Sequence, residues 1–184
     1  RLADRMRVEA QALAKLQHPH IVHVFDLGTS PHGRPFLVME RLVGETLSDR
    51  QRRMGVLAPN EACRHVLAIL EALTAAHAIG VVHRDIKGEN VFLHQDHGNI
   101  VVKLLDFGVA KILEGSDGVP PPRFGTEEGT LVGTPRFCSP EQIVGSKDID
   151  HRADLYSVGA LLFLLLTGRR PFEHPTVVEL LRAH

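Results

Sequence analysis

The chain has 184 residues, with 21 lysines and arginines against 22 aspartates and glutamates, so its formal net charge is −1. Hydrophobic residues make up 43% of the sequence, which can supply a core and excludes a mainly disordered chain. The length allows one domain and excludes a long multidomain organisation. Because the charge is balanced and no block of like charges occurs, general binding to nucleic acid or to an anionic membrane is not expected.

The cysteines and the apolar segments indicate in which cellular compartment the chain is expected. Cys63 and Cys138 lie far apart without a CxxC spacing, so neither a disulfide scaffold nor a zinc ribbon is predicted, and a cytoplasmic location fits best. The longest apolar run, residues 158–166, is well short of the roughly 20 residues that span a bilayer, so we expect no membrane segment in this chain. The chain opens with Arg1 and without a secretory signal pattern, and we expect a piece of a longer protein.

Apolar periodicity predicts both helices and strands in the first half of the chain. Apolar residues at helical spacing predict a helix over residues 1–16, which ends before Pro19. Residues 21–27 and 35–42 are β-rich and flank a turn-forming cluster, so we expect two antiparallel strands. A polar stretch then leads to a long apolar stripe, which predicts a helix over residues 59–78.

The second half predicts polar loops held between short strands, followed by more helices. The expected elements are strands at residues 81–82, 91–93 and 101–105 and helices at residues 150–166 and 176–183. Residues 114–130 are rich in glycine and proline and predict an exposed segment. Polar loops between strands are a common setting for functional residues.

Three polar segments stand out by their order and spacing. Residues 83–90 read His-Arg-Asp-Ile-Lys-Gly-Glu-Asn, residues 106–108 read Asp-Phe-Gly, and residues 133–141 read Gly-Thr-Pro-Arg-Phe-Cys-Ser-Pro-Glu. With these segments the whole chain resembles the eukaryotic-like protein kinases. Further details, such as the Thr-Gly-Arg-Arg-Pro-Phe of residues 167–172, resemble the bacterial serine/threonine branch of that family.

The resemblance implies a protein-kinase-like α+β fold over residues 1–184. Residues 1–42 would form the remainder of the small lobe and the hinge, and residues 43–184 the mainly helical large lobe without its last helices. Within the large lobe, residues 83–90 would be the catalytic loop and residues 106–141 the activation segment. No glycine-rich GxGxxG loop and no strand lysine precede the first helix, so we expect the isolated fragment to be weakly active or inactive.

The residue types in these segments suit phosphoryl transfer from ATP, which needs charge to offset the phosphate oxygens and a group that holds the acceptor hydroxyl in line. Asp85 is the candidate that accepts or orients the hydroxyl proton. Lys87 is a compact cation that can neutralise the transferred phosphoryl group. Asn90 and Asp106 are hard oxygen ligands of the type that Mg²⁺ selects, and together they would hold the metal ions.

Some of these residues have a structural alternative. An isolated Asp85 would more often be a turn former or a helix cap, and only its setting beside Lys87, Asn90 and the Asp-Phe-Gly segment favours the catalytic loop. Asp154 has a sufficient structural role as the cap of the helix that it opens, whereas the resemblance implies that it anchors the backbone of the catalytic loop.

The family pattern also bears on histidine and on the nucleotide. It implies that His83 packs in an apolar stack instead of acting as a base. Glu9 would pair with a strand lysine that grips the ATP phosphates. The adenine end of the pocket would be lined by Met39, Glu40 and Leu42, with Phe92 as its floor, although these residues could equally form plain core.

Regulation and substrate class follow from the same resemblance. Lys87 together with Thr134 matches the serine/threonine pattern, which implies protein substrates that present a serine or threonine hydroxyl. Arg84 would clamp a phosphate on the activation segment, and Thr126 and Thr130 are the nearest acceptors. A homodimer that phosphorylates its own activation loops is compatible with this arrangement.

Three classes of function stay open at this stage. The first is an ATP- and Mg²⁺-dependent serine/threonine protein kinase that acts in signal transduction. The second is a pseudokinase or kinase-like protein-binding module, against which the intact Asp85, Lys87, Asn90 and Asp106 argue. The third is a small-molecule kinase of the aminoglycoside phosphotransferase type, against which the segment at residues 133–141 argues, because kinases use it to hold peptide substrates.

Overall fold

The computed structural model describes residues 16–32, 35–107, 136–146, 148–174 and 176–183 of the chain. Residues 1–15 of the first expected helix and the whole segment 114–130 lie outside these residues. Within the described part both helices and antiparallel strands occur, which agrees with the expected α+β class.

The first described elements form a two-stranded antiparallel sheet. β1 (Val24–Thr29) pairs with β2 (Pro35–Met39), and Leu27 lies opposite Leu37 in the register. Turn-forming residues between the strands let the chain reverse direction. The expected antiparallel pair is therefore confirmed, although β2 ends at Met39 and does not continue to residue 42.

A short strand and a helix follow that the apolar pattern did not predict. β3 (Gly44–Thr46) leads directly into α2 (Leu47–Met54), whose first turn is capped by the Thr46 hydroxyl, which accepts a hydrogen bond from the Asp49 amide at 3.1 Å. Among the α2 residues Leu47 alone is buried. The helix therefore lacks the apolar stripe that identifies a helix in a sequence.

The second sheet has three strands in the order β3-β4-β5, in which β4 (Val91–Asp96) and β5 (Asn99–Leu104) form a hairpin. This hairpin contains most of the two later strands that the pattern predicted. The strand expected at residues 81–82 is wrong, because these residues form a loop in which the Val81 amide donates to the Ala76 carbonyl at 3.0 Å. Val81 is buried by packing against the core without strand pairing.

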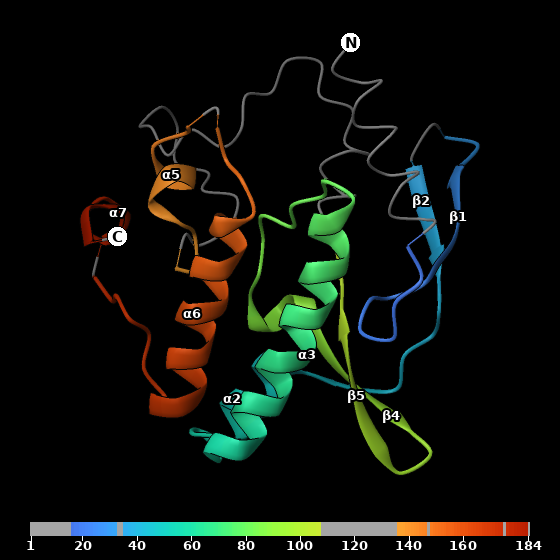
Figure 1. Cartoon of the computed structure of the whole chain (residues 1–184), viewed down its shortest axis with the longest axis horizontal. Coiled ribbons are helices and arrows are strands. Elements are labelled where there is room, and N and C mark those ends of the chain that lie inside the picture. The colour runs from blue at the N-terminus through green and yellow to red at the C-terminus, as the bar shows by residue number, and fades with distance from the viewer. Residues whose placement is uncertain (1–15, 33–34, 108–135, 147, 175, 184) are drawn as a thin grey trace.

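Two long helices form the centre of the molecule. α3 (Pro59–Ala78) and α6 (Arg152–Thr167) lie side by side (Figure 1). Their bounds agree closely with the helices predicted over residues 59–78 and 150–166. The largest fully buried apolar side chains that these helices contribute to the core are Ile69, Leu73, Leu161 and Leu165. Burial of each such side chain stabilises the fold by about 1.5–3 kcal/mol.

Short helices complete the described chain. α5 (Pro140–Ile143) precedes α6, and α7 (Val177–Ala183) matches the helix expected over residues 176–183. A single turn of 3₁₀ helix, η1 (Gly88–Asn90), leads into β4. In the part of the chain that the structure describes, no helix combines the length and apolar character needed to cross a membrane.

The segment before β1 joins the small sheet to β5. The Val22 amide donates to the Leu104 carbonyl at 3.0 Å, and the Leu104 amide donates to the His20 carbonyl at 2.9 Å. These bonds form an isolated parallel bridge between Ile21 and Leu104, which ties the segment before β1 to the end of β5.

Candidate active site

Residues 83–90 connect α3 to β4, and they bring three of the predicted site residues together. Lys87 Nζ lies 2.8 Å from Asp85 Oδ2. The side-chain nitrogen of Asn90 donates to the Asp85 carbonyl at 2.8 Å and to Asp85 Oδ2 at 3.0 Å. Asp85 Oδ2 is thus held by a cation and an amide, and Oδ1 has no hydrogen bond to the described residues, so it can receive an outside donor.

Asp154 of α6 holds the backbone of this loop through its completely buried carboxylate. Its Oδ2 accepts a hydrogen bond from the His83 amide at 2.9 Å and lies 2.8 Å from His77 Nε2, and its Oδ1 accepts one from the Arg84 amide at 2.8 Å. These donors offset the cost of burying a charge. Asp154 therefore anchors the loop, as the resemblance implied, and does not cap α6.

The loop contains a strained backbone conformation at Arg84, which has φ 64°. A non-glycine residue rarely adopts this left-handed region, and such strain persists only where the surroundings enforce it. The enforcing contacts are the Asp154 carboxylate on the Arg84 amide and the Gln142 side chain, which donates to the Arg84 carbonyl at 2.8 Å. Gln142 also accepts a hydrogen bond from the Ser139 amide at 3.1 Å, so the start of α5 and the loop are held as a unit.

His83 connects the loop to the segment that carries Asp106. Its ring packs against Phe107 with centroids 4.7 Å apart, as expected, and its side chain is almost fully buried. Burial lowers the pKa of His83 and keeps the ring neutral. Because Nδ1 accepts from the Asp85 amide at 3.2 Å, Nε2 carries the proton and donates to the Leu105 carbonyl at 2.8 Å.

The two predicted metal ligands are brought to the same region by Leu105. The Leu105 amide donates to the Asn90 carbonyl at 2.8 Å, so Asp106, the residue after Leu105, lies close in the fold to the loop that contains Asn90. Asp106 has φ 51° and an exposed side chain. The Asn90 amide nitrogen is used by Asp85, which leaves the Asn90 amide oxygen and the Asp106 carboxylate as hard donors. This donor set fits Mg²⁺, which commonly binds one or two protein oxygens and keeps waters and phosphates as its other ligands.

The described residues contain no group of three or more histidine, cysteine, aspartate or glutamate side chains that could hold a metal ion. A fully protein-built metal cage is therefore not part of this region. The pair of oxygen donors from Asn90 and Asp106 instead requires that substrate phosphates and waters complete any coordination shell.

The residues predicted at the adenine end lie near the link between β2 and β3. Met39 ends β2 with a partly exposed side chain, and Leu42 is half-buried. Phe92 of β4 is also half-buried and lies opposite Thr46 in the register. The carboxylate of Glu40 is bound to Lys103 at 2.7 Å, so it is engaged within the protein.

Several predicted residues lie outside the described ranges, namely Glu9, Thr126, Thr130 and Thr134. Conversely, the positions of His77, Gln142 and Lys103 at this site were not predicted. Each acts on a partner more than 50 residues away, so its role has no signal in local spacing.

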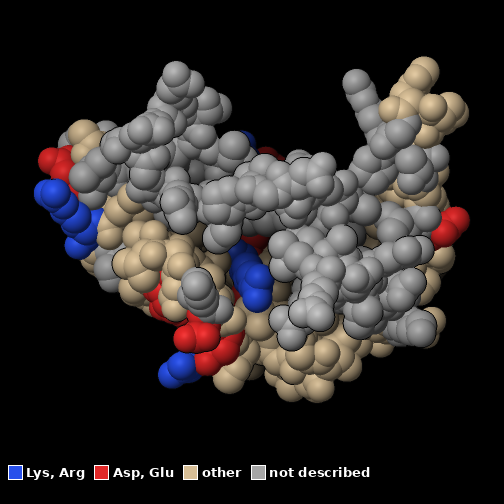
Figure 2. Space-filling model, turned by 90° about the horizontal axis from the view of Figure 1, so that it is seen from above, with Lys and Arg blue, Asp and Glu red and all other residues tan. Residues whose placement is uncertain are grey.

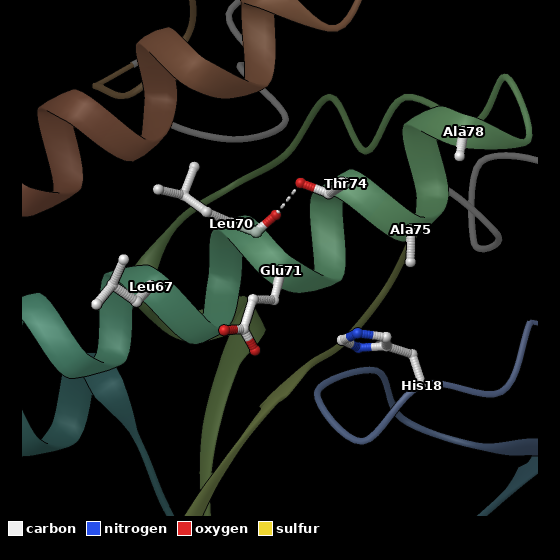
Figure 3. Close-up of a pocket in the computed structure, with 7 residues that line it drawn as sticks. All are labelled: His18, Leu67, Leu70, Glu71, Thr74, Ala75 and Ala78. Carbon is white, nitrogen blue, oxygen red and sulfur yellow. Dashed lines mark hydrogen bonds between the residues drawn. The ribbon is translucent and has the colours of Figure 1, made fainter.

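The structure also contains a shallow groove along α3 (Figure 3). It is lined by residues of α3, among them Leu67, Glu71 and Thr74, and by His18 from the segment before β1. The Thr74 hydroxyl donates to the Leu70 carbonyl at 2.8 Å. None of residues 83–90 is among the described residues that line this groove. On the face seen in Figure 2, the described charged side chains form separate small groups of each sign.

Residues 1–183 match the family profile described as "Protein kinase domain". Two similar relatives come from Myxococcus xanthus: Serine/threonine-protein kinase Pkn1 is 42% identical and Serine/threonine-protein kinase pkn3 is 40% identical, each over 185 residues. Both comparisons cover 100% of this chain, but the chain spans only 25% of Pkn1 and 33% of pkn3. Serine/threonine-protein kinase PksC of Streptomyces coelicolor is 41% identical over 98% of this chain and 32% of that relative.

A solved structure gives the same result for the fold. The crystal structure of Rad53 1-466 in complex with AMP-PNP is 28% identical, with a TM-score of 0.76 over 98% of this chain and 42% of that chain. The expected α+β fold of the kinase type is therefore confirmed for this chain.

Proposed function

The chain belongs to the protein kinase domain family, and on that premise we propose that the complete protein transfers the γ-phosphate of ATP to serine or threonine hydroxyl groups of other proteins. The observation that carries the proposal is the cluster in which one oxygen of Asp85 is held by Lys87 and Asn90 while its other oxygen has no hydrogen bond to the described residues. Such an arrangement suits a carboxylate that receives a hydroxyl group.

Asp85 would orient the acceptor hydroxyl and take its proton through Oδ1. Its Oδ2 atom is held by Lys87 at 2.8 Å, while Oδ1 has no hydrogen bond to the described residues and is left for the acceptor hydroxyl. Lys87, which is partly exposed, would neutralise charge on the transferred phosphoryl group. Asn90 also holds Asp85, because its side-chain nitrogen donates to the Asp85 carbonyl and to Oδ2.

Mg²⁺, held by Asn90 and Asp106, would neutralise phosphate charge when bound. The chain's own contribution to this site is to set the direction of these two side chains. The bond from the Leu105 amide to the Asn90 carbonyl and the packing of Phe107 on His83 hold the segment at Asp106 against the loop.

The proposal extends to the organisation of the domain. Residues 1–42 would act as the remainder of the small lobe with the hinge, and residues 43–184 as the large lobe. Glu9 would pair with a strand lysine, and Met39 and Leu42 would border the adenine over Phe92.

Regulation and setting complete the proposal. Arg84, whose side chain is exposed, would bind phosphate on Thr126 or Thr130, and two chains could phosphorylate one another at these sites. A cytoplasmic location supplies the ATP. It also agrees with the lack of a disulfide between Cys63 and Cys138.

The test is phosphate transfer from labelled ATP to a generic protein substrate by the complete gene product and its Asp85→Asn variant. We expect the variant to lose about 10²- to 10⁴-fold in rate, as is usual for loss of a positioned acid–base group. The matched control is Asp150→Asn. The native Asp150 carboxylate binds Arg152 and has no hydrogen bond to the described residues 83–90. Equal rates for Asp85→Asn and the native protein would remove the catalytic assignment.

A pseudokinase or kinase-like binding module predicts a different result from the same experiment. In that case the native protein would bind nucleotide or protein partners without measurable transfer, and Asp85→Asn would change nothing. Unfolding curves recorded on each variant separate a loss of chemistry from a loss of fold.

A further inference from the structure

Glu40, the residue that follows β2, is bound from two directions. Its Oε1 atom accepts a hydrogen bond from Lys103 Nζ at 2.7 Å and one from the His23 amide at 2.8 Å. The Glu40 amide in turn donates to the His23 carbonyl at 2.9 Å. Residue 40 is therefore clamped to the start of β1 through both its backbone and its side chain, and to β5 through Lys103.

This ion pair is more enclosed than ordinary surface pairs of the chain. The exposed fraction is 13% for the Lys103 side chain and 23% for the Glu40 side chain, against 67% and 47% for the exposed Arg52–Asp49 pair on α2. Partial burial would raise the pKa of Glu40, but the hydrogen bonds from Lys103 and His23 outweigh it and keep the pKa below its ordinary value. Enclosed charges are screened less by solvent and salt, so the pair can transmit a positional constraint.

The pair joins two segments that matter for the proposed nucleotide site. Glu40 begins the linker of residues 40–43, which leads from β2 to β3. Lys103 lies on β5 three residues before Asp106. The nearby backbone bonds between Leu104 and residues 20 and 22 tie β5 to the segment before β1, but they do not reach the linker.

We propose that Glu40 and Lys103 form a positioning pair that sets nucleotide affinity by holding linker 40–43 at a fixed spacing from β5, the strand that leads to Asp106. The inference rests on the proposed function, because it needs a nucleotide to lie along the linker. It also gives Glu40 a role that differs from lining the adenine pocket: its carboxylate is committed to Lys103 and His23, and it acts on the nucleotide through the linker.

The experiment measures the KM for ATP, the KM for a protein substrate and kcat for the complete gene product and its variants. The variants are Glu40→Gln, Lys103→Met and the double substitution. We expect each single variant to raise the KM for ATP about three- to tenfold, with kcat and the KM for protein substrate nearly unchanged, as suits the loss of one partly enclosed ion pair. The double variant should resemble the single variants, because the second substitution has no partner left to remove.

The matched control is Arg52→Met, which removes a cation from the exposed pair with Asp49. It should leave the KM for ATP unchanged. An unchanged KM for ATP in both single variants would overturn the inference, as would fully additive effects in the double variant. A variant in which kcat and the unfolding midpoint fall while both KM values rise would also overturn it, because that result describes a purely structural pair.

Failure of the proposed function has a separate signature. If the native protein and Arg52→Met both fail to transfer phosphate and to bind a fluorescent ATP analogue, the proposed function falls and the inference falls with it. If the native protein transfers phosphate and the Glu40 and Lys103 variants match it in every constant, only the inference falls.

Discussion

Replacing the buried Asp154 by asparagine tests how the loop of residues 83–90 is held. The substitution keeps the shape of the side chain but removes its charge and turns one acceptor oxygen into a donor. If the new amide nitrogen replaces Oδ1, it faces the Arg84 amide, which in the native protein donates to Oδ1 at 2.8 Å. If the new amide nitrogen replaces Oδ2, it faces the His83 amide, which in the native protein donates to Oδ2 at 2.9 Å. In either orientation a backbone donor at this buried site loses its partner.

The magnitude follows from these contacts. An unpaired buried donor costs about 1–3 kcal/mol, and hydrogen bonds to a charged acceptor are worth about 1.5–3 kcal/mol each, so we expect a net loss near 3 kcal/mol. For a domain of this size that corresponds to a fall of roughly 6–12 °C in the unfolding midpoint. Activity should fall as well, because the backbone that carries Asp85 is no longer held at the positive φ of Arg84.

The assay is thermal unfolding followed by circular dichroism, together with phosphate transfer by the same preparations. Asp150→Asn is the control, since Asp150 is exposed and its asparagine form can still accept from the Arg152 amide. If Asp154→Asn unfolds at the same temperature as Asp150→Asn, the anchoring role of the buried carboxylate is refuted.

Three further predictions follow from single contacts. Gly88→Ala should destabilise the protein by about 1–3 kcal/mol in urea unfolding, because its new Cβ would lie 3.0 Å from the Ser48 amide nitrogen; a neutral result would refute this close approach. Gln142→Met should cost about 1–2 kcal/mol in the same assay, through loss of the capping box and of the bond to the Arg84 carbonyl, and an unchanged midpoint would contradict it. The pKa of Glu40 is lowered from its ordinary value of 4.5, so its stabilising contribution is present above that value and is lost as the pH falls through the folded-state pKa. The stability difference between the native protein and Glu40→Gln should therefore be largest above the ordinary value of 4.5 and narrow as the pH falls below it, and a difference that grows on acidification would refute the sign.

Local patterns determined the elements whose signals lie within a few residues of each other. The bounds of α3 follow from Pro59 at its first position and from an apolar stripe that needs a core, and the structure agrees with the predicted residues 59–78. The spacing of Asp85, Lys87 and Asn90 is equally local, because a loop that closes with one 3₁₀ turn at η1 brings these side chains together. The family, and the closeness of these three side chains, could therefore be predicted from the sequence.

Tertiary structure alone decided the contacts that hold this loop in place. Asp154 meets His83 and Arg84 across about 70 positions of sequence, and Lys103 meets Glu40 across 63. The two-residue run at 81–82 is apolar like a strand, yet Val81 is buried without strand pairing, and α2 forms with hardly any apolar stripe. Periodicity records which side of an element is buried, but the partner that a buried polar group finds depends on how helices and sheets pack, and that information is spread over the whole chain.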